Sequence, residues 1–208
     1  KQTKRLKVLA DDAAPANKMA LAIFASNNQI DLGLTELANS LTGFEAEILT
    51  GNPDRGKALA SSCISCHGND FTGMVSERSP SLPQLSDWYM QSQMQKFKHN
   101  VRGYEVTDSD GAVMKALMQN YSHQQMADMV AYIRTYKPKE QAISLGGDPL
   151  KGKVHYQTCI ACHQVDGTGN KLVNAPSLLG HSDLYVYNQL IKYRNGHRGN
   201  GSGDKAGK

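Results

Sequence analysis

The sequence predicts an all-α chain in which one helical domain occurs twice in tandem. Residues 53–103 align with residues 149–199 without a gap, at an offset of 96 residues and with 20 identical residues in 51 positions. Apolar residues recur at helical spacing, and no segment of useful length shows the alternation of a strand. Because there are two copies only, the duplication indicates two domains and not a solenoid of stacked repeats.

Each copy begins with a predicted helix start. Asn52-Pro53 and Asp148-Pro149 place a capping side chain before a proline at the first helical position. A second helix is predicted to begin at Ser86-Asp87 and, in the other copy, at Ser182-Asp183. In the first copy, the inward face of this helix is expected to contain Tyr89, Gln93 and Phe97, with Met90 and Met94 as further candidates.

The first copy has a further predicted helix. Ser122 and Gln125 fit a capping box, and an apolar stripe follows at Met126, Met129, Val130 and Ile133. Pro138 ends this helix. The predicted organisation is an N-terminal helical extension at 1–50, a first domain at 51–138, a linker at 139–147 and a second domain at 148–208.

The N-terminal extension lies outside the duplication. Apolar residues from Leu34 to Ile48 predict an amphipathic helix over 34–50, although Gly43 weakens it, and 18–26 is a second candidate helix. The basic start at 1–7 has no apolar region after it and is not an intact secretion signal. The extension either docks on the two domains or binds a partner, and the sequence does not choose.

Composition excludes two classes of protein. The formal net charge of +4 is scattered along the chain and does not form the basic stripe that tracks nucleic acid. The sequence contains no run of eighteen apolar residues, so it predicts no transmembrane helix.

The four cysteines form two frames of the same kind, Cys63-Ile-Ser-Cys66-His67 and Cys159-Ile-Ala-Cys162-His163. This pattern is the attachment site of c-type haem, in which two thiols bond to the vinyl groups and the histidine ligates the iron. Zinc sites pair their cysteine motifs about fifteen to twenty residues apart, far less than 96. A redox dithiol needs no histidine after each frame. We therefore expect two covalently attached haem c groups.

Together these features resemble the class I c-type cytochrome fold. Two such domains, each with Pro-x-Leu followed by Tyr-x-x-x-Gln, are similar to the dihaem cytochrome c-four family over residues 52–199. The resemblance implies that His67 and His163 are proximal iron ligands. It also implies that the carbonyls of Pro80 and Pro176 accept a hydrogen bond from the other ring nitrogen of these histidines.

The resemblance places the distal ligand of the first haem on a methionine loop before the last helix. Met114, eight residues before Ser122, is the expected ligand, and Met118 is the competitor. Met126 and Met129 fall on the apolar stripe and are expected in the core.

The second copy departs from this pattern. The position equivalent to Met114 would be 210, and no methionine follows Met129. We expect that the natural chain continues beyond Lys208. Otherwise the distal ligand is a different residue, with His181 and His197 as candidates, or the site is open. His155 is expected at the surface, and the glycine-rich residues 199–208 are expected to form a flexible tail.

The resemblance implies a periplasmic electron carrier without enzymatic activity. Its donor would be a quinol-oxidising complex and its acceptor a terminal oxidase or reductase. Two alternatives stay open: an electron-transfer subunit of a larger dehydrogenase or respiratory complex, and a dihaem oxidoreductase acting at an open second haem. The sequence leaves the oligomeric state open.

Overall fold

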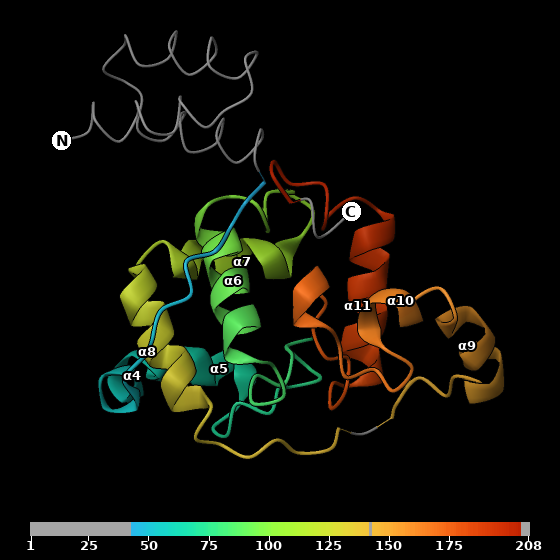
Figure 1. Cartoon of the computed structure of the whole chain (residues 1–208). Coiled ribbons are helices and arrows are strands. Elements are labelled where there is room, and N and C mark those ends of the chain that lie inside the picture. The colour runs from blue at the N-terminus through green and yellow to red at the C-terminus, as the bar shows by residue number, and fades with distance from the viewer. Residues whose placement is uncertain (1–42, 142, 205–208) are drawn as a thin grey trace, which may run out of the picture.

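The computed structural model describes residues 43–141 and 143–204, and every regular element in these ranges is a helix (Figure 1). A single isolated bridge, between Asn170 and Ala175, is the only β-type pairing in the described ranges. None of the described helices has the length and apolar character needed to cross a membrane. The predicted all-α class is therefore confirmed. The helix predicted over 18–26 lies outside the described residues, and so does the first part, 34–42, of the helix predicted over 34–50.

The helices occur in two groups that follow the duplication. The first half contains α4 (Pro53–Leu59), η1 (Ala60–Cys63), α5 (Ile64–His67), α6 (Asp87–Lys98), α7 (Ser109–Met118) and α8 (His123–Ile133). The second half contains α9 (Pro149–Tyr156), α10 (Ile160–His163), η2 (Lys171–Val173) and α11 (Asp183–Arg194). Residues 134–141 and 143–148, which lie between the halves in the sequence, form no helix (Figure 1).

The predicted helix starts are confirmed. The Asn52 side chain accepts from the Arg55 N–H at α4, and Asp148 accepts from the two N–H groups of residues 150 and 151 at α9. Ser122 and Gln125 form both hydrogen bonds of the capping box at α8. These local signals succeed because a capping bond joins residues two or three positions apart and needs no tertiary partner.

Helices α4 and α8 approach each other closely. A Cβ added at Gly56 would lie 1.9 Å from the carbonyl oxygen of Asp128, so only glycine permits this packing. The Asp128 carboxylate accepts from the backbone N–H of Asn52 at 2.7 Å and from the Arg55 guanidinium at 2.8 Å. Asp128 therefore fixes the start of the helix that leads to the first cysteine frame.

Replacing Asp128 with alanine is expected to lower the free energy of unfolding at pH 7 by about 1–3 kcal/mol. Hydrogen bonds from Arg55, followed by those from Asn52 and Gln124, hold the pKa of Asp128 at about 2. Because this pKa is below the value near 4 of an unfolded chain, the stabilisation is complete above about pH 4 and is lost as the pH falls toward 2.

Urea unfolding of wild type and variant at pH 7 and pH 2.5 measures this effect. The difference between the two proteins should shrink at the lower pH. Asp54→Ala, an exposed change on α4, the helix whose start Asp128 fixes, is the control and should stay within about 0.5 kcal/mol of wild type. An Asp128→Ala penalty of equal size at both pH values would contradict the role of the charge.

The core of the described chain lies in the first half. The predicted stripe of α8 is buried, with Met126, Met129, Val130 and Ile133 all at most 2% exposed. On α6, Tyr89, Met90 and Phe97 are buried, whereas Gln93 and Met94 are only half-buried. In the second half, α9, α10 and α11 bury no residue, and several large apolar side chains are exposed, including those of Leu150, Val154, Leu172 and Leu190.

Residues 43–51 form an extended segment that lies along α6 and α8 (Figure 1). Two buried glutamine side chains of α6 pair with its backbone. Gln95 bonds the N–H and C=O of Glu47 at 2.9 and 2.6 Å, and Gln91 bonds those of Leu49 at 2.9 and 3.0 Å. The helix predicted over 34–50 is therefore wrong for 43–50, because these glutamines take the backbone groups that a helix would use internally.

The glycine-rich C-terminal residues also differ from the prediction of a flexible tail. Asp204 is buried and pairs with Lys96 of α6 at 2.5 Å, and the Gly203 carbonyl accepts from the Phe44 N–H at 2.8 Å. Residues 199–204 thus pack on the first half. Composition suggested flexibility, but one buried ion pair and the close approach that glycines permit hold the segment in place.

Candidate haem attachment sites

Both cysteine frames end a helical run at the start of their half. Cys63 closes η1, and Cys66 and His67 lie on α5; in the second half Cys162 and His163 lie on α10. All four thiols are free. Cys63 is 8% exposed and His67 is 6% exposed, whereas Cys162 is exposed. Each frame therefore presents two thiols and one imidazole within about one turn of helix.

The histidine of each frame is held by a proline carbonyl thirteen residues later. Nδ1 of His67 lies 3.1 Å from the carbonyl oxygen of Pro80, and Nδ1 of His163 lies 2.9 Å from that of Pro176. Because a carbonyl only accepts, Nδ1 must carry the proton, which leaves Nε2 with its lone pair. No hydrogen bond to either Nε2 occurs among the described residues.

The loop between each histidine and its proline is closed by the same backbone hydrogen bond in both halves. The N–H of Gly73 donates to the His67 carbonyl at 2.9 Å, and that of Gly169 donates to the His163 carbonyl at 3.0 Å. Both glycines have positive φ, 89° and 83°. A Cβ at Gly73 would lie 2.7 Å from the Ser79 carbonyl oxygen, so glycine is needed where the loop folds back.

An aspartate and a threonine brace each loop as well. Asp70 accepts from the hydroxyl of Thr72 at 2.7 Å, and Asp166 accepts from that of Thr168 at the same distance. These residues are identical between the copies, but aspartate and threonine are not expected to ligate haem iron. The repeat alone therefore did not show that they stabilise the loop. Their position in an Asx turn explains why both copies retain them.

Burial sets the protonation of the first frame. It raises the pKa of the Cys63 thiol above its ordinary value, whereas reactive dithiols have a lowered pKa. Burial also lowers the pKa of His67, and its hydrogen bond to Pro80 offsets part of this effect. At neutral pH the site therefore contains a protonated thiol and a neutral imidazole, which is the form of histidine that binds a metal.

The donor set fits a covalently attached haem c in both halves. The cysteines of each frame would form the thioether bonds, and Nε2 of His67 or His163 would ligate the iron, with Pro80 or Pro176 fixing the imidazole. In the described ranges, no group of three or more His, Cys, Asp or Glu side chains is arranged to hold a metal ion by itself.

The two methionine candidates of the first half lie on α7. The structure corrects the expected loop, because Asp108 caps a helix there by accepting from the Gly111 N–H at 3.1 Å. Met114 is half-buried and packs against the core, whereas Met118 is 1% exposed and belongs to the core itself. Met126 and Met129 are buried in the core, as predicted.

The histidines considered for the second half have different surroundings. Burial lowers the pKa of His181 to about 4, and its Nδ1 is buried without a hydrogen-bond partner among the described residues. His197 lies 3.2 Å from the Thr107 hydroxyl of the first half. His155 is exposed, as predicted.

Comparison with known proteins supports the same family. The cytochrome c family model matches residues 53–137 and 150–208. Cytochrome c4 of Azotobacter vinelandii is 29% identical over 184 residues, which cover 82% of this chain and 81% of that protein. A thiosulfate dehydrogenase electron acceptor of Thiomonas intermedia is 28% identical over 162 residues, covering 71% of this chain and 68% of that protein.

Solved structures share the arrangement of two domains. Reduced cytochrome c4 from Pseudomonas stutzeri superimposes with a TM-score of 0.58 at 24% identity, over 73% of this chain and 84% of that one. Cytochrome c4 of Acidithiobacillus ferrooxidans gives a TM-score of 0.56 at 26% identity, over 66% and 83%. The chain therefore belongs to the cytochrome c family, as an electron-transfer protein with covalently bound haem c.

Proposed function

We propose that this protein is a periplasmic dihaem electron carrier that passes electrons from a respiratory donor to a terminal oxidase or reductase. The observation that carries the proposal is the repeated site geometry. Each half combines a C-x-x-C-H frame with a histidine whose Nδ1 meets a proline carbonyl, at 3.1 and 2.9 Å. Two equivalent redox centres in one chain suit a relay or a two-electron store.

The residues of the chain act on each centre in distinct ways. Thioether bonds would fix the cofactor, and the proline carbonyl orients the imidazole and would strengthen it as an iron donor. Met114, the proposed distal ligand of the first haem, would close the remaining iron position and favour the ferrous form. The haem supplies the one-electron chemistry, while a closed coordination shell disfavours direct reaction with a substrate.

A second candidate function has its own support. Two similar proteins, from Thiomonas intermedia and Stutzerimonas stutzeri, are named thiosulfate dehydrogenase electron acceptors, and each is 28% identical to this chain. This chain would then accept electrons from a sulfur-oxidising enzyme instead of a quinol-oxidising complex. Two further alternatives are an electron-transfer subunit of a larger dehydrogenase or respiratory complex and an oxidoreductase that acts at an open second haem.

The functions differ in coordination and in partner. A carrier should be low-spin at both haems, should not bind cyanide on mixing, and should not oxidise thiosulfate alone. Rapid mixing of the oxidised protein with a reduced quinol-oxidising complex or a reduced sulfur-oxidising enzyme distinguishes the two donors. Only the physiological donor should reduce the protein at a rate that saturates as the donor concentration rises. A high-spin ferric component that binds cyanide would overturn the carrier and support the oxidoreductase.

A further inference from the structure

The two halves meet through contacts that repeat across the interface in reciprocal form. Lys96 of α6 pairs with Asp204 of the second half at 2.5 Å, and Lys192 of α11 pairs with Asp108 of the first half at 2.6 Å. The two lysines are separated by 96 residues, and so are the two aspartates. The lysine of each half therefore pairs with the aspartate of the other half, and the two pairs occupy equivalent positions of the repeat.

A second set of contacts across the interface repeats this exchange with arginine and glutamine. Arg102 donates to Gln93 of its own half at 2.8 Å and to Gln189 of the other at 3.0 Å. Arg198, its counterpart, donates to Gln189 at 2.7 Å and to Gln93 at 3.5 Å. The contact is thus isologous, like that of a two-fold symmetric dimer.

Asp108 also caps a helix, in addition to forming the ion pair with Lys192. It is the N-cap residue of α7, and its side chain is 3% exposed. A Cβ at Gly111 would lie 2.2 Å from the Asp108 carboxylate, so the capping side chain sits directly against the first turn. Movement of the Asp108 side chain would therefore disturb the first turn of α7.

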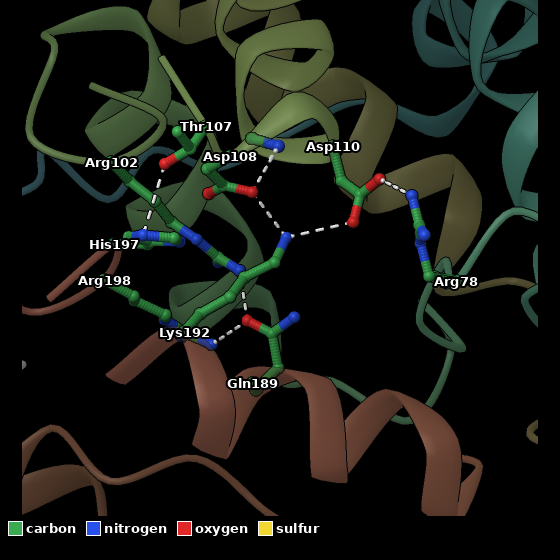
Figure 2. A network of polar contacts seen from close by, with 10 residues as sticks. Arg78, Arg102, Thr107, Asp108, Asp110, Gln189, Lys192, His197 and Arg198 are labelled. Carbon is green, nitrogen blue, oxygen red and sulfur yellow. Dashed lines mark hydrogen bonds and ion pairs between the residues drawn. The ribbon is translucent and has the colours of Figure 1, made fainter. Parts of the chain in front are cut away.

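Lys192 is the group that holds this carboxylate. Figure 2 shows its ammonium between Asp108 and Asp110, with Arg78 on the far side of Asp110. The Lys192 side chain is 15% exposed, and its contacts with the two carboxylates are 2.6 and 3.1 Å. Arg78 pairs only with the half-exposed Asp110, so Lys192 is the one cation paired with Asp108 in the described part of the chain.

We propose that Lys192, a residue of the second half, is a positioning residue for Met114 at the first haem, acting through the Asp108 cap of α7. Met114 lies on α7 less than two turns after the cap, and its side chain packs against the core of the first half. The inference rests on the proposed role of Met114 as distal ligand. It means that docking of the second half sets how firmly the first iron keeps its methionine.

The physical reason is the cost of an unpaired buried charge. Without Lys192, the Asp108 carboxylate stays buried with no cation, and the chain relieves this by moving the carboxylate toward water. This movement weakens the cap at the Gly111 N–H and loosens α7. The methionine then competes less well with hydroxide or other ligands for the iron.

The test uses the full-length holoprotein and the charge-transfer band between methionine and ferric iron. Met114→Ala first identifies the part of the band that belongs to the first haem. For Lys192→Met, the midpoint pH at which this part disappears on alkaline titration is expected to fall by about one unit or more. Lys192→Arg should restore the midpoint. Asp108→Asn should give a smaller decrease, because asparagine still caps the helix and leaves no buried charge.

Two controls separate positioning from general damage. Lys96→Met breaks the reciprocal pair with Asp204 and should leave the first-haem midpoint near wild type, as should Arg194→Met at an exposed position of α11. Equal decreases for Lys192→Met and Lys96→Met would overturn the inference in favour of a loosened interface, and an unchanged Lys192→Met midpoint would overturn it directly. A band whose intensity is unchanged by Met114→Ala would refute the ligand assignment and the inference with it.

Discussion

Replacing Cys159 and Cys162 with alanine is expected to yield a protein with one covalently attached haem, while the haem at Cys63 and Cys66 is retained. Without the two thiols, the second half can form no thioether bond. Its helices α9, α10 and α11 bury no residue, so the haem is expected to provide most of the apolar core there. This half should therefore lose its structure along with its cofactor.

Intact mass under denaturing conditions measures the attached haem, and limited proteolysis measures the structure. The mass should fall by one haem, and cleavage should begin within residues 149–204. Ala161→Ser changes the same frame to the residue of the first frame and is the control, expected to retain both haems. The inverse variant, Cys63→Ala with Cys66→Ala, should lose the other haem. Retention of both haems by either double variant would contradict the assignment of its frame.

Replacing Met114 with alanine is expected to remove the methionine charge-transfer band of the first haem and to lower its reduction potential by on the order of 0.1 V. The thioether ligand favours ferrous iron, and its loss leaves water or a stronger donor in its place. Met118→Ala is the matched control on the same helix. Because Met118 is 1% exposed, this change should lower the free energy of unfolding by about 2–5 kcal/mol but keep the band.

The two variants distinguish a ligand from a core residue. Spectroscopy of the ferric protein detects the iron ligand, and chemical unfolding measures the loss of packing. Met114→Ala should therefore affect mainly the spectrum, and Met118→Ala mainly the free energy of unfolding. If Met118→Ala removed the band and Met114→Ala preserved it, the ligand assignment would have to be exchanged. Loss of the band in both would show that α7 acts as a unit.

The elements that could be predicted from the sequence depend on short-range physics. The caps at Asn52, Asp148 and Ser122 join groups two or three residues apart, and the stripe of α8 follows from helical periodicity alone. The haem frames are likewise contained within five residues each. The duplication then extended the predictions of helix starts and cysteine frames from one half to the other, but not those of the distal methionine and the last helix.

The features that could not be predicted depend on partners far along the chain. Glu47 and Leu49 are extended because Gln95 and Gln91, more than forty residues later, bind their backbone groups. The glycine-rich 199–204 is ordered because Lys96 binds Asp204, a partner 108 residues away. Extending the offset of 96 past residue 199 would have matched Asp204 to Asp108 and pointed to this pair.

The helical backbone at Met114 shows a different limit. The family pattern predicts a loop, yet Asp108 caps a helix whose sequence, from Ser109 to Met118, is rich in alanine, leucine and methionine. The cap is effective because the carboxylate is held by a lysine from the other half. Local propensity and a long-range ion pair together decide the structure of the segment that carries Met114.

The most direct test of the central claim is a potentiometric titration of the purified holoprotein, followed through its haem absorption bands. Two carrier haems predict that each chain takes up two electrons, in two one-electron steps, and that neither step changes when cyanide is present. Uptake of one electron per chain, or a step that shifts with cyanide, would contradict a dihaem electron carrier with two closed iron sites.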